Sequence, residues 1–550
     1  MHINKIKVKN FKKIEDGAFD FNKDVNILVG DNDSGKSTIL EALEIALNCC
    51  YRGKSLAGVL SSEIFNSNAL IKYLKSNKEI DDLPEILIEA YIDGIPEYKG
   101  SNNSEDEDCQ GVFVKVILDE ELIPAYEDFI KDNKEISSIP IEFYKIDWYD
   151  FAWNRVKGLN RKFRALVVDP IRMHPTYGKN QYISNILNAS LEKDKQAVLG
   201  IQYRQLKESF NKNEKVISIN EMLDKDKDIS LKKLEIVADI SGVSSIESNF
   251  QLAVDQVIFP FIGKGEQHKI QIKLAIQNKS KNVDVILVEE PENHLSHMNL
   301  TSLINYIESK RGDKQLFLTT HSSYVMNKLS INKLCLLADK YKKLDKIDPA
   351  VVKNLKRLPG YDTLRSVLSS KVILVEGPSD ELVLKRYYID NYKSLPEENG
   401  IDIIVVRGIG FKNYLEIVKH LGIKTKVVKD NDGSYVKNIK TYEDLYKDYP
   451  SIKVLSHADD ELYSLEPVLI DANSKDINSI DCYAKIILST ATYNNYKKNK
   501  LLPQKKEFLR KWYLDKDGAG KKKVDSAIRI FDSESSIHYP DFIKKVFDFE

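Results

Sequence analysis

The chain has 550 residues, of which 82 are Lys or Arg and 83 are Asp or Glu, giving a net charge of −1. Its content of 42% hydrophobic and 30% charged residues is typical of folded globular proteins and excludes a disordered chain. Because the total charge is close to zero, binding of nucleic acid would need a local basic patch.

A buried strand followed by an amphipathic helix is the first informative pattern along the chain. The near-continuous apolar run VNILV at 25–29 predicts the strand. From Ser37 onward, apolar residues recur at helical spacing, so a glycine-containing loop joins strand and helix. This loop, from Gly30 to Ser37, matches G-x-x-x-x-G-K-[ST], the phosphate-binding pattern of many nucleotide-binding proteins.

The residue types in this loop are those that bind a nucleoside triphosphate. Its glycines let backbone N–H groups surround the β-phosphate, and the helix N-terminus adds its positive dipole end. Lys36 would contact the β- and γ-phosphates, and Ser37 would bind Mg²⁺. A glycine turn that fits by chance is the alternative. The expected ATP-binding residues are Gly30, Asn32, Ser34, Gly35, Lys36, Ser37 and Thr38.

The next two hundred or so residues predict a sheet and an insertion. Strand-like runs occur at 86–92, 112–118 and 141–147. The stretch from about 180 to 250 is mostly helix-forming and predicts a helical insertion. Its heptads do not persist long enough for a long coiled coil, so we expect a short arm or a packing surface.

Two adjacent carboxylates end the buried strand that is predicted at 283–290. Glu289 would hold Mg²⁺ through water, and Glu290 would polarise the water that attacks the γ-phosphate. A strand end with two capped acids is the alternative. His321 follows the strand-like run QLFLTT and could contact the γ-phosphate and sense its loss, although a histidine with only this context is more often structural.

A glycine-containing segment, Gly263-Lys264-Gly265-Glu266-Gln267, opens a helical pattern about twenty residues before the acidic strand. The order of phosphate loop, this segment, acidic strand and histidine resembles that of ABC ATPases, and the runs EPENHL and IKVKNFKKI resemble their SMC-type DNA-repair branch. In that superfamily the signature loop of one subunit closes on the nucleotide of the other. The resemblance therefore implies a dimer, with Gly263, Gly265 and Gln267 contacting the nucleotide.

A lysine-rich segment broken by Pro349 and Pro359 separates the chain into two parts. We expect an ATPase domain at 1–345, a linker at 346–370 and a second domain at 371–550. Strand and helix patterns alternate after the linker, which indicates a small parallel α/β domain.

Acidic residues follow two predicted strands of this second domain. Glu376 ends the first strand, and Asp430 and Asp432 end another. Because the carboxyl ends of parallel strands open into one crevice, the three carboxylates could converge there. Oxygen ligands suit two Mg²⁺ or Mn²⁺ ions about 3.5–4 Å apart, which can activate water and neutralise the leaving oxygen of a phosphodiester. Acids that serve as caps or lie in solvated turns are the alternative.

The pattern E-G-x-x-D/E followed by D-x-D resembles the Toprim domain of primases, topoisomerases and certain nucleases. Behind an SMC-like ATPase, it is similar to the OLD (overcoming lysogenization defect) family of nucleases. The resemblance implies an α/β fold, with an N-terminal ABC-type P-loop ATPase that carries a helical insertion and a C-terminal Toprim domain. The metal-site acids that it implies are Glu376, Asp380, Asp430, Asp432 and Glu466.

The later part of the second domain carries one acid and one lysine of the Toprim pattern. Glu466 stands in Ser464-Leu465-Glu466, where a D-L-E-like motif of the family would have an acid at the first position. The family also places a lysine near the scissile phosphate, and Lys523 corresponds to it, with Lys521 and Lys522 as alternatives.

The resemblance implies an ATP-regulated endonuclease that depends on Mg²⁺ or Mn²⁺ and nicks or cuts DNA as a homodimer or higher homo-oligomer. Similar nucleases act in bacterial antiviral defence, including Gabija-like and retron-associated systems. A helicase-like companion protein, or a reverse transcriptase with its nucleic acid, is therefore an expected partner. Two alternatives are an SMC-like DNA-binding ATPase with a noncatalytic Toprim scaffold and a Toprim nuclease acting on RNA such as tRNA. The sign of ATP's effect on cutting stays open.

Cysteine usage and hydropathy predict the compartment. The five cysteines contain no C-x-x-C pair, which favours reduced thiols over a disulfide framework or a zinc site. No apolar run approaches the ~18 residues that cross a bilayer, and the charged N-terminus lacks the apolar segment of a signal peptide. We therefore expect a cytoplasmic protein that does not contact a membrane.

Overall fold

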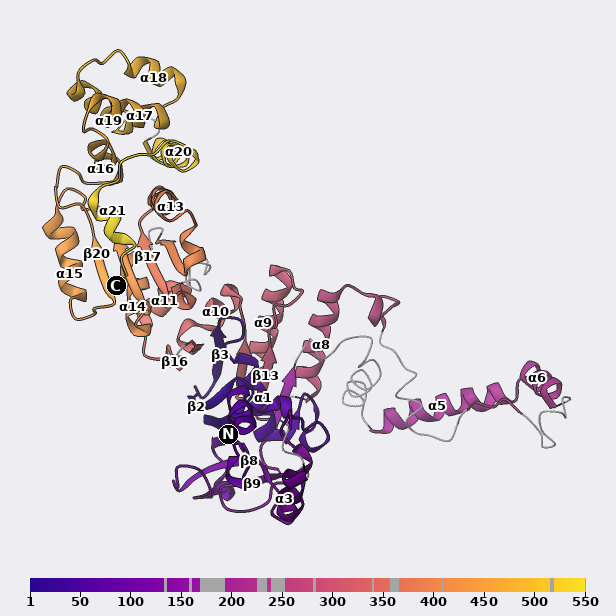
Figure 1. The fold of residues 1–550 in the computed structure, drawn as a ribbon. Helices are drawn as coiled ribbons and strands as arrows, with labels where there is room; N and C mark the ends of the chain where they lie inside the picture. Colours follow the sequence, from indigo (N-terminus) through magenta and orange to yellow (C-terminus); the bar gives the residue numbers. More distant parts are fainter. Residues whose placement is uncertain are drawn as a thin grey trace. The chain divides into compact units, whose positions relative to one another are not determined.

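The computed structural model describes residues 1–132, 136–157, 161–168, 193–224, 235–238, 253–279, 283–338, 341–356, 366–406, 410–514 and 519–549. Its internal contacts divide the chain into two units, Met1–His321 and Ser322–Glu550, which Figure 1 draws as ribbons. The predicted domain boundary after residue 345 stays a prediction. Parts of the predicted insertion and of the predicted linker lie outside the described residues.

An antiparallel sheet forms one layer of the first unit, in the order β2-β1-β6-β8-β7 with β9 paired to β8. Its strands are β1 (His2–Phe11), β2 (Ile14–Asp20), β6 (Ile86–Asp93), β7 (Lys99–Gly100), β8 (Cys109–Leu118) and β9 (Tyr144–Asp150). The alternation of apolar residues in β1 buries Ile3, Ile6 and Val8. The strand predicted at 141–147 begins three residues late, because a 3₁₀ turn follows Pro140, whose fixed φ favours a turn.

A parallel sheet forms the second layer of this unit, and four of its strands lie in the order β10-β13-β14-β3. They are β3 (Val25–Gly30), β10 (Ala165–Val168), β13 (Val285–Glu289) and β14 (Gln315–Thr319). Their nearly continuous apolar sequences reflect burial on both faces. Helix α1 (Lys36–Asn48) packs against strands of both layers and is buried along most of its length. The phosphate loop, the acidic strand end and His321 therefore lie along one edge of the parallel sheet.

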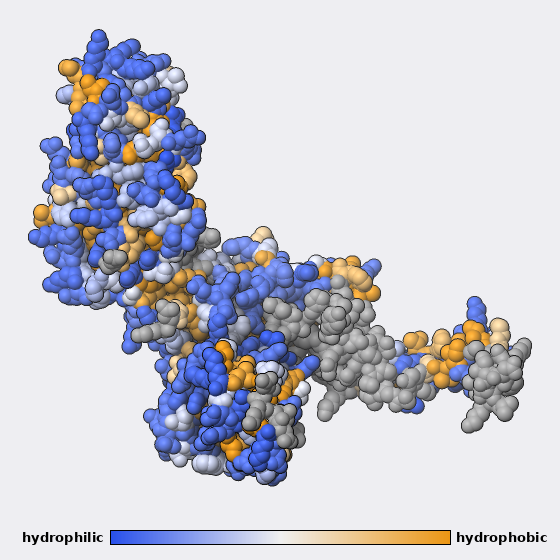
Figure 2. All heavy atoms as spheres, in the orientation of Figure 1, coloured by the Kyte–Doolittle hydropathy of each residue, from blue (hydrophilic) through white to orange (hydrophobic). Residues whose placement is uncertain are grey.

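Further helices of the first unit are α2 (Ser67–Lys75), α3 (Ile123–Asp132), α5 (Lys193–Asn211), α6 (Glu214–Asp224), α8 (Lys264–Lys279) and α9 (His297–Arg311). Helices α5 and α6 lie in the predicted insertion and expose large apolar side chains (Figure 2). These side chains are Val198, Leu199, Ile201, Leu206, Phe210, Ile217, Ile219 and Met222. Exposed apolar surface of this kind is typical of a contact site for another macromolecule.

A four-stranded parallel sheet with the order β18-β17-β19-β20 organises the second unit. Its strands are β17 (Lys371–Val375), β18 (Ile401–Val405), β19 (Lys424–Val428) and β20 (Ile452–Leu455). Helix α13 (Pro378–Tyr392) follows β17, and helix α14 (Phe411–Leu421) follows β18. The predicted alternation of strands and helices is thus observed. Before this sheet come α10 (Ser323–Leu329), β15 (Leu334–Leu337), β16 (Tyr341–Lys343) and α11 (Pro349–Lys356).

Short helices complete the second unit, and α17, α18 and α19 lie together at one end of it (Figure 1). They are α15 (Thr441–Tyr446), α16 (Leu465–Ala472), α17 (Ile477–Ile487), α18 (Thr490–Tyr496), α19 (Leu502–Leu514), α20 (Ala519–Asp532) and α21 (Asp541–Val546). A single apolar core joins many of them to the sheet, with Tyr483, Tyr496 and Leu509 fully or almost fully buried. None of the described helices combines the length and the apolar character that crossing a bilayer requires.

Candidate functional site

The phosphate loop places a buried lysine at the start of α1. Gly35 has φ 95°, a left-handed conformation that favours glycine, and the helix begins at the next residue. The Lys36 ammonium donates hydrogen bonds to the carbonyl oxygens of Gly30 at 3.0 Å and Asp31 at 2.7 Å. Burial lowers the pKa of Lys36, and the carboxylates of Glu290, Asp31, Glu289 and Glu292 oppose this effect. A cation beside a helix N-terminus is an arrangement that suits phosphate.

The other predicted residues of this loop differ in their exposure. Asn32 and Ser37 are exposed and Thr38 is buried. The Ser34 hydroxyl oxygen is buried and has no hydrogen-bond partner among the described residues. A buried hydroxyl of this kind is a donor that a phosphate oxygen can satisfy.

The acidic strand end brings Glu290 close to His321. Glu290 has φ 38°, an uncommon conformation for a residue other than glycine, and its backbone N–H donates to the carbonyl oxygen and the hydroxyl of Thr319, both at 3.1 Å. Its carboxylate accepts from the Asn293 amide at 2.8 Å and lies 3.6 Å from His321 Nε2. Glu289, one residue earlier, is half-buried at the end of β13. The structure therefore orients Glu290 from three sides.

Glu292 is a member of this edge to which the sequence analysis gave no role. Its Oε1 accepts hydrogen bonds from the Thr320 hydroxyl at 2.7 Å and from the His321 backbone N–H at 2.6 Å. Burial raises the pKa of Glu292, and its Oε2 is buried without a partner among the described residues. Glu292 thus fixes the backbone that carries His321. The only available signal in the sequence was its position two residues after the catalytic-type glutamate in EPE.

The glycine-containing segment before α8 is held by contacts of its own. A Cβ atom on Gly265 would lie 2.5 Å from the carbonyl oxygen of His294, so the chain packs too closely there for a side chain. The Gln267 amide donates to the carbonyl oxygens of Phe259 at 3.0 Å and Ile262 at 2.9 Å. Gly263 is exposed with open space around it. Of the three predicted residues, Gly263 is the one most open to a partner.

Neighbouring strands bring Glu376 and the Asp430 segment together in the second unit. Val375 of β17 pairs with Val428 of β19, so Glu376 and Lys429 lie side by side one residue later. The Lys429 ammonium is 3.1 Å from Glu376 Oε1 and 3.5 Å from Asp432 Oδ2. One cation therefore contacts carboxylates from both strand ends.

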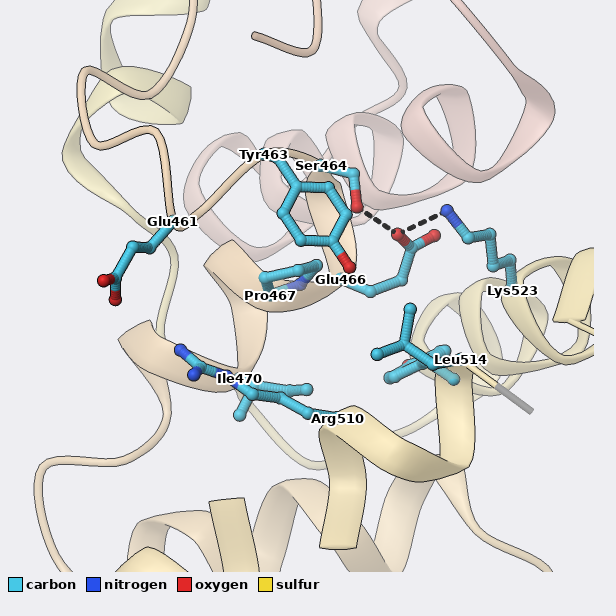
Figure 3. A pocket seen from close by; sticks show the side chains of 10 residues that line it. Glu461, Tyr463, Ser464, Glu466, Pro467, Ile470, Arg510, Leu514 and Lys523 are labelled. Atoms are coloured by element: carbon cyan, nitrogen blue, oxygen red, sulfur yellow. Dashed lines mark hydrogen bonds and ion pairs between the residues drawn. The ribbon is translucent and has the colours of Figure 1, made fainter. Parts of the chain in front are cut away.

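Glu466 enters the same site from the first turn of α16. Its carboxylate, only 6% exposed, accepts from the Ser464 hydroxyl at 2.9 Å and from the Lys523 ammonium of α20 at 2.8 Å (Figure 3). Lys522 instead lies over the Trp512 ring, 5.9 Å from its centroid. The side chain of Lys521 lies outside the described residues.

Electrostatic coupling joins four of the predicted acids. Burial, together with the carboxylates of Asp380, Glu376 and Glu466, raises the pKa of Asp430 to about 8, and the Lys523 ammonium opposes this shift. Burial likewise raises the pKa of Asp380 to about 7, although its carboxylate accepts from the Gly377 N–H at 2.9 Å. These are like charges crowded into one poorly solvated site.

Asp432 lies apart from this group. It has φ 47° and a side chain that is 61% exposed, and it pairs with Lys429 at the rim. The loop that carries it is held by Asn431, whose buried amide donates to the carbonyl oxygens of His457 and Asp459, both at 2.9 Å. The structure thus places four predicted acids in the centre of the site and one at its edge.

The donor set of this site fits a hard divalent cation. All candidate ligands are carboxylates, which suit Mg²⁺ and Mn²⁺, and a bound cation would relieve the crowding that raises the aspartate pKa values. Among the described residues, no three His, Cys, Asp or Glu side chains are already arranged so that they could hold one metal ion. Lys429 and Lys523 provide positive charge beside the acids. Binding of a metal would therefore require these side chains to rearrange.

The raised pKa values predict a pH-dependent stability of the metal-free protein. Aspartates titrate near 3.9 in an unfolded chain, whereas Asp380 and Asp430 have pKa values of about 7 and about 8 in the folded one. The folded state therefore holds more protons between about pH 4 and 8, and the free energy of unfolding should fall as the pH rises. In EDTA, we expect the thermal midpoint to drop from pH 5.5 to pH 8.5, and to drop less in Asp430→Asn. Equal drops in both proteins would contradict this explanation.

Two family models match the chain. The model described as "AAA domain, putative AbiEii toxin, Type IV TA system" matches residues 25–327, and "Overcoming lysogenization defect protein-like, TOPRIM domain" matches residues 367–432. These matches confirm the predicted combination of an N-terminal P-loop ATPase domain and a C-terminal Toprim domain.

The chain is also similar to curated relatives and to solved structures. Endonuclease GajA of Bacillus cereus (strain HuB5-5) is 22% identical over 585 residues, which cover 85% of this chain and 82% of that protein. Endonuclease GajA of Bacillus cereus (strain VD045) is 25% identical over 37% of this chain and 38% of that protein. The SMC head bound to the C-terminal winged-helix domain of ScpA is 15% identical, with a TM-score of 0.34, over 63% of this chain and 99% of that chain.

Proposed function

The chain belongs to the AAA-domain family whose model matches it and carries an OLD-like TOPRIM domain, and we propose that it is an ATP-binding endonuclease that uses Mg²⁺ or Mn²⁺ to nick or cleave DNA. The observation that carries this proposal is that Glu376 and Asp430 follow neighbouring parallel strands and lie close enough to the buried Glu466 for the three carboxylates to interact electrostatically. Two relatives named as endonucleases support it. The proposed domains are the ATPase at 1–345, a linker at 346–370 and the Toprim nuclease at 371–550.

Five carboxylates of the second unit are the proposed metal ligands, namely Glu376, Asp380, Asp430, Asp432 and Glu466. A bound divalent ion supplies Lewis acidity and a more acidic water molecule. The chain itself supplies charge and orientation: Ser464 and Lys523 both hold the Glu466 carboxylate. From that position the Lys523 ammonium can donate to a non-bridging phosphate oxygen and stabilise the negative charge of the transition state.

The residues along the edge of the first unit are the proposed ATP site. Lys36 and the loop around it would bind the β- and γ-phosphates, with Ser37 and Glu289 as the Mg²⁺ ligands. Glu290, which Asn293 orients, would polarise the attacking water. His321 lies beside Glu290 and would contact the γ-phosphate. Glu292 would act as a positioning residue, because it holds the His321 backbone.

We propose a homodimer or a higher homo-oligomer as the working state. The exposed Gly263 and the exposed apolar side chains of α5 and α6 support contacts with another copy. Gly265 and Gln267 would complete the nucleotide contact across that interface. A role in antiphage defence in the cytoplasm, with a helicase-like protein or a reverse transcriptase and its nucleic acid, extends this proposal through the family resemblance alone.

A noncatalytic Toprim scaffold is the second candidate. It is favoured by the two lysines that already pair with the acids, and by the lack of a ready cation cluster in the described residues. In that case the chain would be a DNA-binding ATPase without a cutting site.

The test combines substrate and metal removal. Purified protein is incubated with supercoiled plasmid, and separately with total tRNA, in Mg²⁺, in Mn²⁺ and in EDTA. We expect nicking of plasmid in either metal and none in EDTA, because the carboxylates alone cannot neutralise the leaving oxygen. Glu376→Gln should be inactive under all conditions. Cutting of tRNA but not of plasmid would change the substrate class, and no cutting of either would favour the scaffold.

A further inference from the structure

A cavity of about 240 Å³ lies beside the Glu466–Lys523 ion pair (Figure 3). It is lined by residues of α16, α19 and α20 and of the loop before α16. Glu466 and Lys523 line this cavity and also belong to the proposed cutting site. A group bound in the cavity would therefore lie next to the phosphate that Lys523 contacts.

The size and walls of the cavity suit one heterocyclic ring system. A cavity of about 150 Å³ is known to hold benzene, whereas sites for drug-sized molecules occupy about 300–1,000 Å³. Pro467, Ile470 and Leu514 provide apolar walls, and Tyr463 adds an aromatic ring that is 37% exposed. Apolar and aromatic walls match the flat face of a nucleobase, and they offer no hydrogen bonds to a phosphate.

Arg510 provides the polar complement. It is one of the residues that line the cavity (Figure 3). The Arg510 guanidinium carries five N–H donors, and the edge of every nucleobase carries acceptors. The cavity thus combines apolar walls with a guanidinium among its lining groups.

We propose that this cavity receives one base of the cut strand, turned out of the helical stack next to the scissile phosphate. The inference rests on the proposed nuclease function and adds its substrate class, which is DNA with a nucleotide that leaves the stack easily. Tyr463 and Leu514 contact the face of the base, and Arg510 donates to its edge. Arg510 is a positioning residue, because it holds the strand and does not touch the reacting atoms.

A cavity that receives one base should make the enzyme prefer DNA in which that base is easily turned out. Turning a base out of a duplex costs least where it is mismatched or already single-stranded. Duplexes with one unpaired nucleotide beside the cut should therefore be nicked with a lower KM than the fully paired duplex of the same sequence.

The first experiment removes the base and fills the cavity. Oligonucleotide duplexes carrying the mapped nicking site are made with an abasic residue at each position near the cut. At one position, the abasic substrate should raise the KM of the wild type by roughly 5- to 150-fold, which corresponds to the ~1–3 kcal/mol that a base–aromatic contact contributes. Leu514→Trp, which fills the cavity from an exposed position, should raise the KM for the intact duplex similarly and be insensitive to the abasic residue, because both changes remove one contact.

Arg510→Gln and Lys511→Gln form a matched pair on α19. Arg510→Gln should raise the KM for the intact duplex while leaving kcat within a few fold. Lys511 is 75% exposed and pairs with Glu507 at 3.3 Å, so Lys511→Gln should behave as the wild type. Additive effects of Leu514→Trp and base removal, or wild-type KM values for both cavity variants, would overturn the inference.

A second measurement does not depend on cutting. A 2-aminopurine base is placed at the sensitive position, and its fluorescence is followed in EDTA as protein is added. A base that leaves the stack should change its fluorescence severalfold with wild type and much less with Leu514→Trp. An unchanged signal with wild type would overturn the inference. Failure of the proposed function would give a different result, namely nicking by Glu376→Gln. Failure of the inference about the cavity would appear only in the cavity variants Leu514→Trp and Arg510→Gln.

Discussion

Replacing Asp430 by Asn is expected to lower plasmid nicking at least about 100-fold while raising the thermal stability of the metal-free protein. The activity falls because a proposed metal ligand loses its charge, and even the indirect partners of metal ligands cost about 10–100-fold when they are removed. The stability rises because burial and three neighbouring carboxylates make the ionised Asp430 unfavourable in the folded chain, as its pKa of about 8 indicates. The amide keeps the volume of the side chain and carries no charge.

Asp430→Asn is informative because its nicking activity should fall while its thermal stability rises. A loss of nicking caused by misfolding would come with a lower thermal midpoint, whereas the expected variant is inactive and more stable above neutral pH. Asp448→Asn is the matched control, since Asp448 is an exposed aspartate of the same unit, and it should change neither property. Undiminished nicking by Asp430→Asn would reject the nuclease and leave the DNA-binding ATPase with a Toprim scaffold.

The positions of the carboxylates at the two strand ends could be predicted from the sequence. Glu376 and Asp430 each follow a run of buried apolar residues, and parallel strands of one sheet end at the same edge. The phosphate loop was predictable for the same reason, because a strand, a glycine turn and a helix occur in fixed order around Lys36. In these places the local pattern determines both the element and the edge at which its last residue lies.

The charges that surround these carboxylates were not predictable. Lys429 contacts Glu376 across 53 residues of sequence, through a strand register that no local pattern specifies. Lys and Arg side chains have many rotamers, so their partners depend on packing that only the folded chain defines. Arg510 carries no motif, and its relevance comes from the packing of α19 against α16.

The contacts of the glycine-containing segment before α8 could not be predicted from its motif. Its resemblance to the ABC signature loop implies Gly265 and Gln267 as nucleotide contacts, but in the folded chain Gly265 packs against the His294 carbonyl and the Gln267 amide binds its own loop. A motif specifies residue types and order, whereas the partner of each side chain is set by neighbours outside the motif.

Replacing Lys36 by Ala is expected to weaken ATP binding about 100-fold and to remove any effect of ATP on nicking. The Lys36 ammonium lies in the phosphate loop beside the N-terminus of α1, held by the carbonyl oxygens of Gly30 and Asp31. Hydrogen bonds to charged groups contribute about 1.5–3 kcal/mol each, and about 2.8 kcal/mol corresponds to 100-fold in affinity. Labelled ATP measures the binding, and titration of ATP against plasmid nicking measures the coupling and its sign.

Lys54→Ala, at an exposed lysine of the same unit, is the control and should keep both properties. If ATP regulates the Toprim site through this loop, the nicking rate of Lys36→Ala in ATP should equal the wild-type rate without ATP, whichever direction ATP acts. A wild-type response to ATP in Lys36→Ala, despite the weakened binding of ATP at this loop, would place the regulatory nucleotide at another site. Coupling between the two sites requires that ATP binds the phosphate loop. Nicking rates of the wild type and of Lys36→Ala, each measured against ATP concentration, therefore test whether ATP regulates the nuclease through this loop.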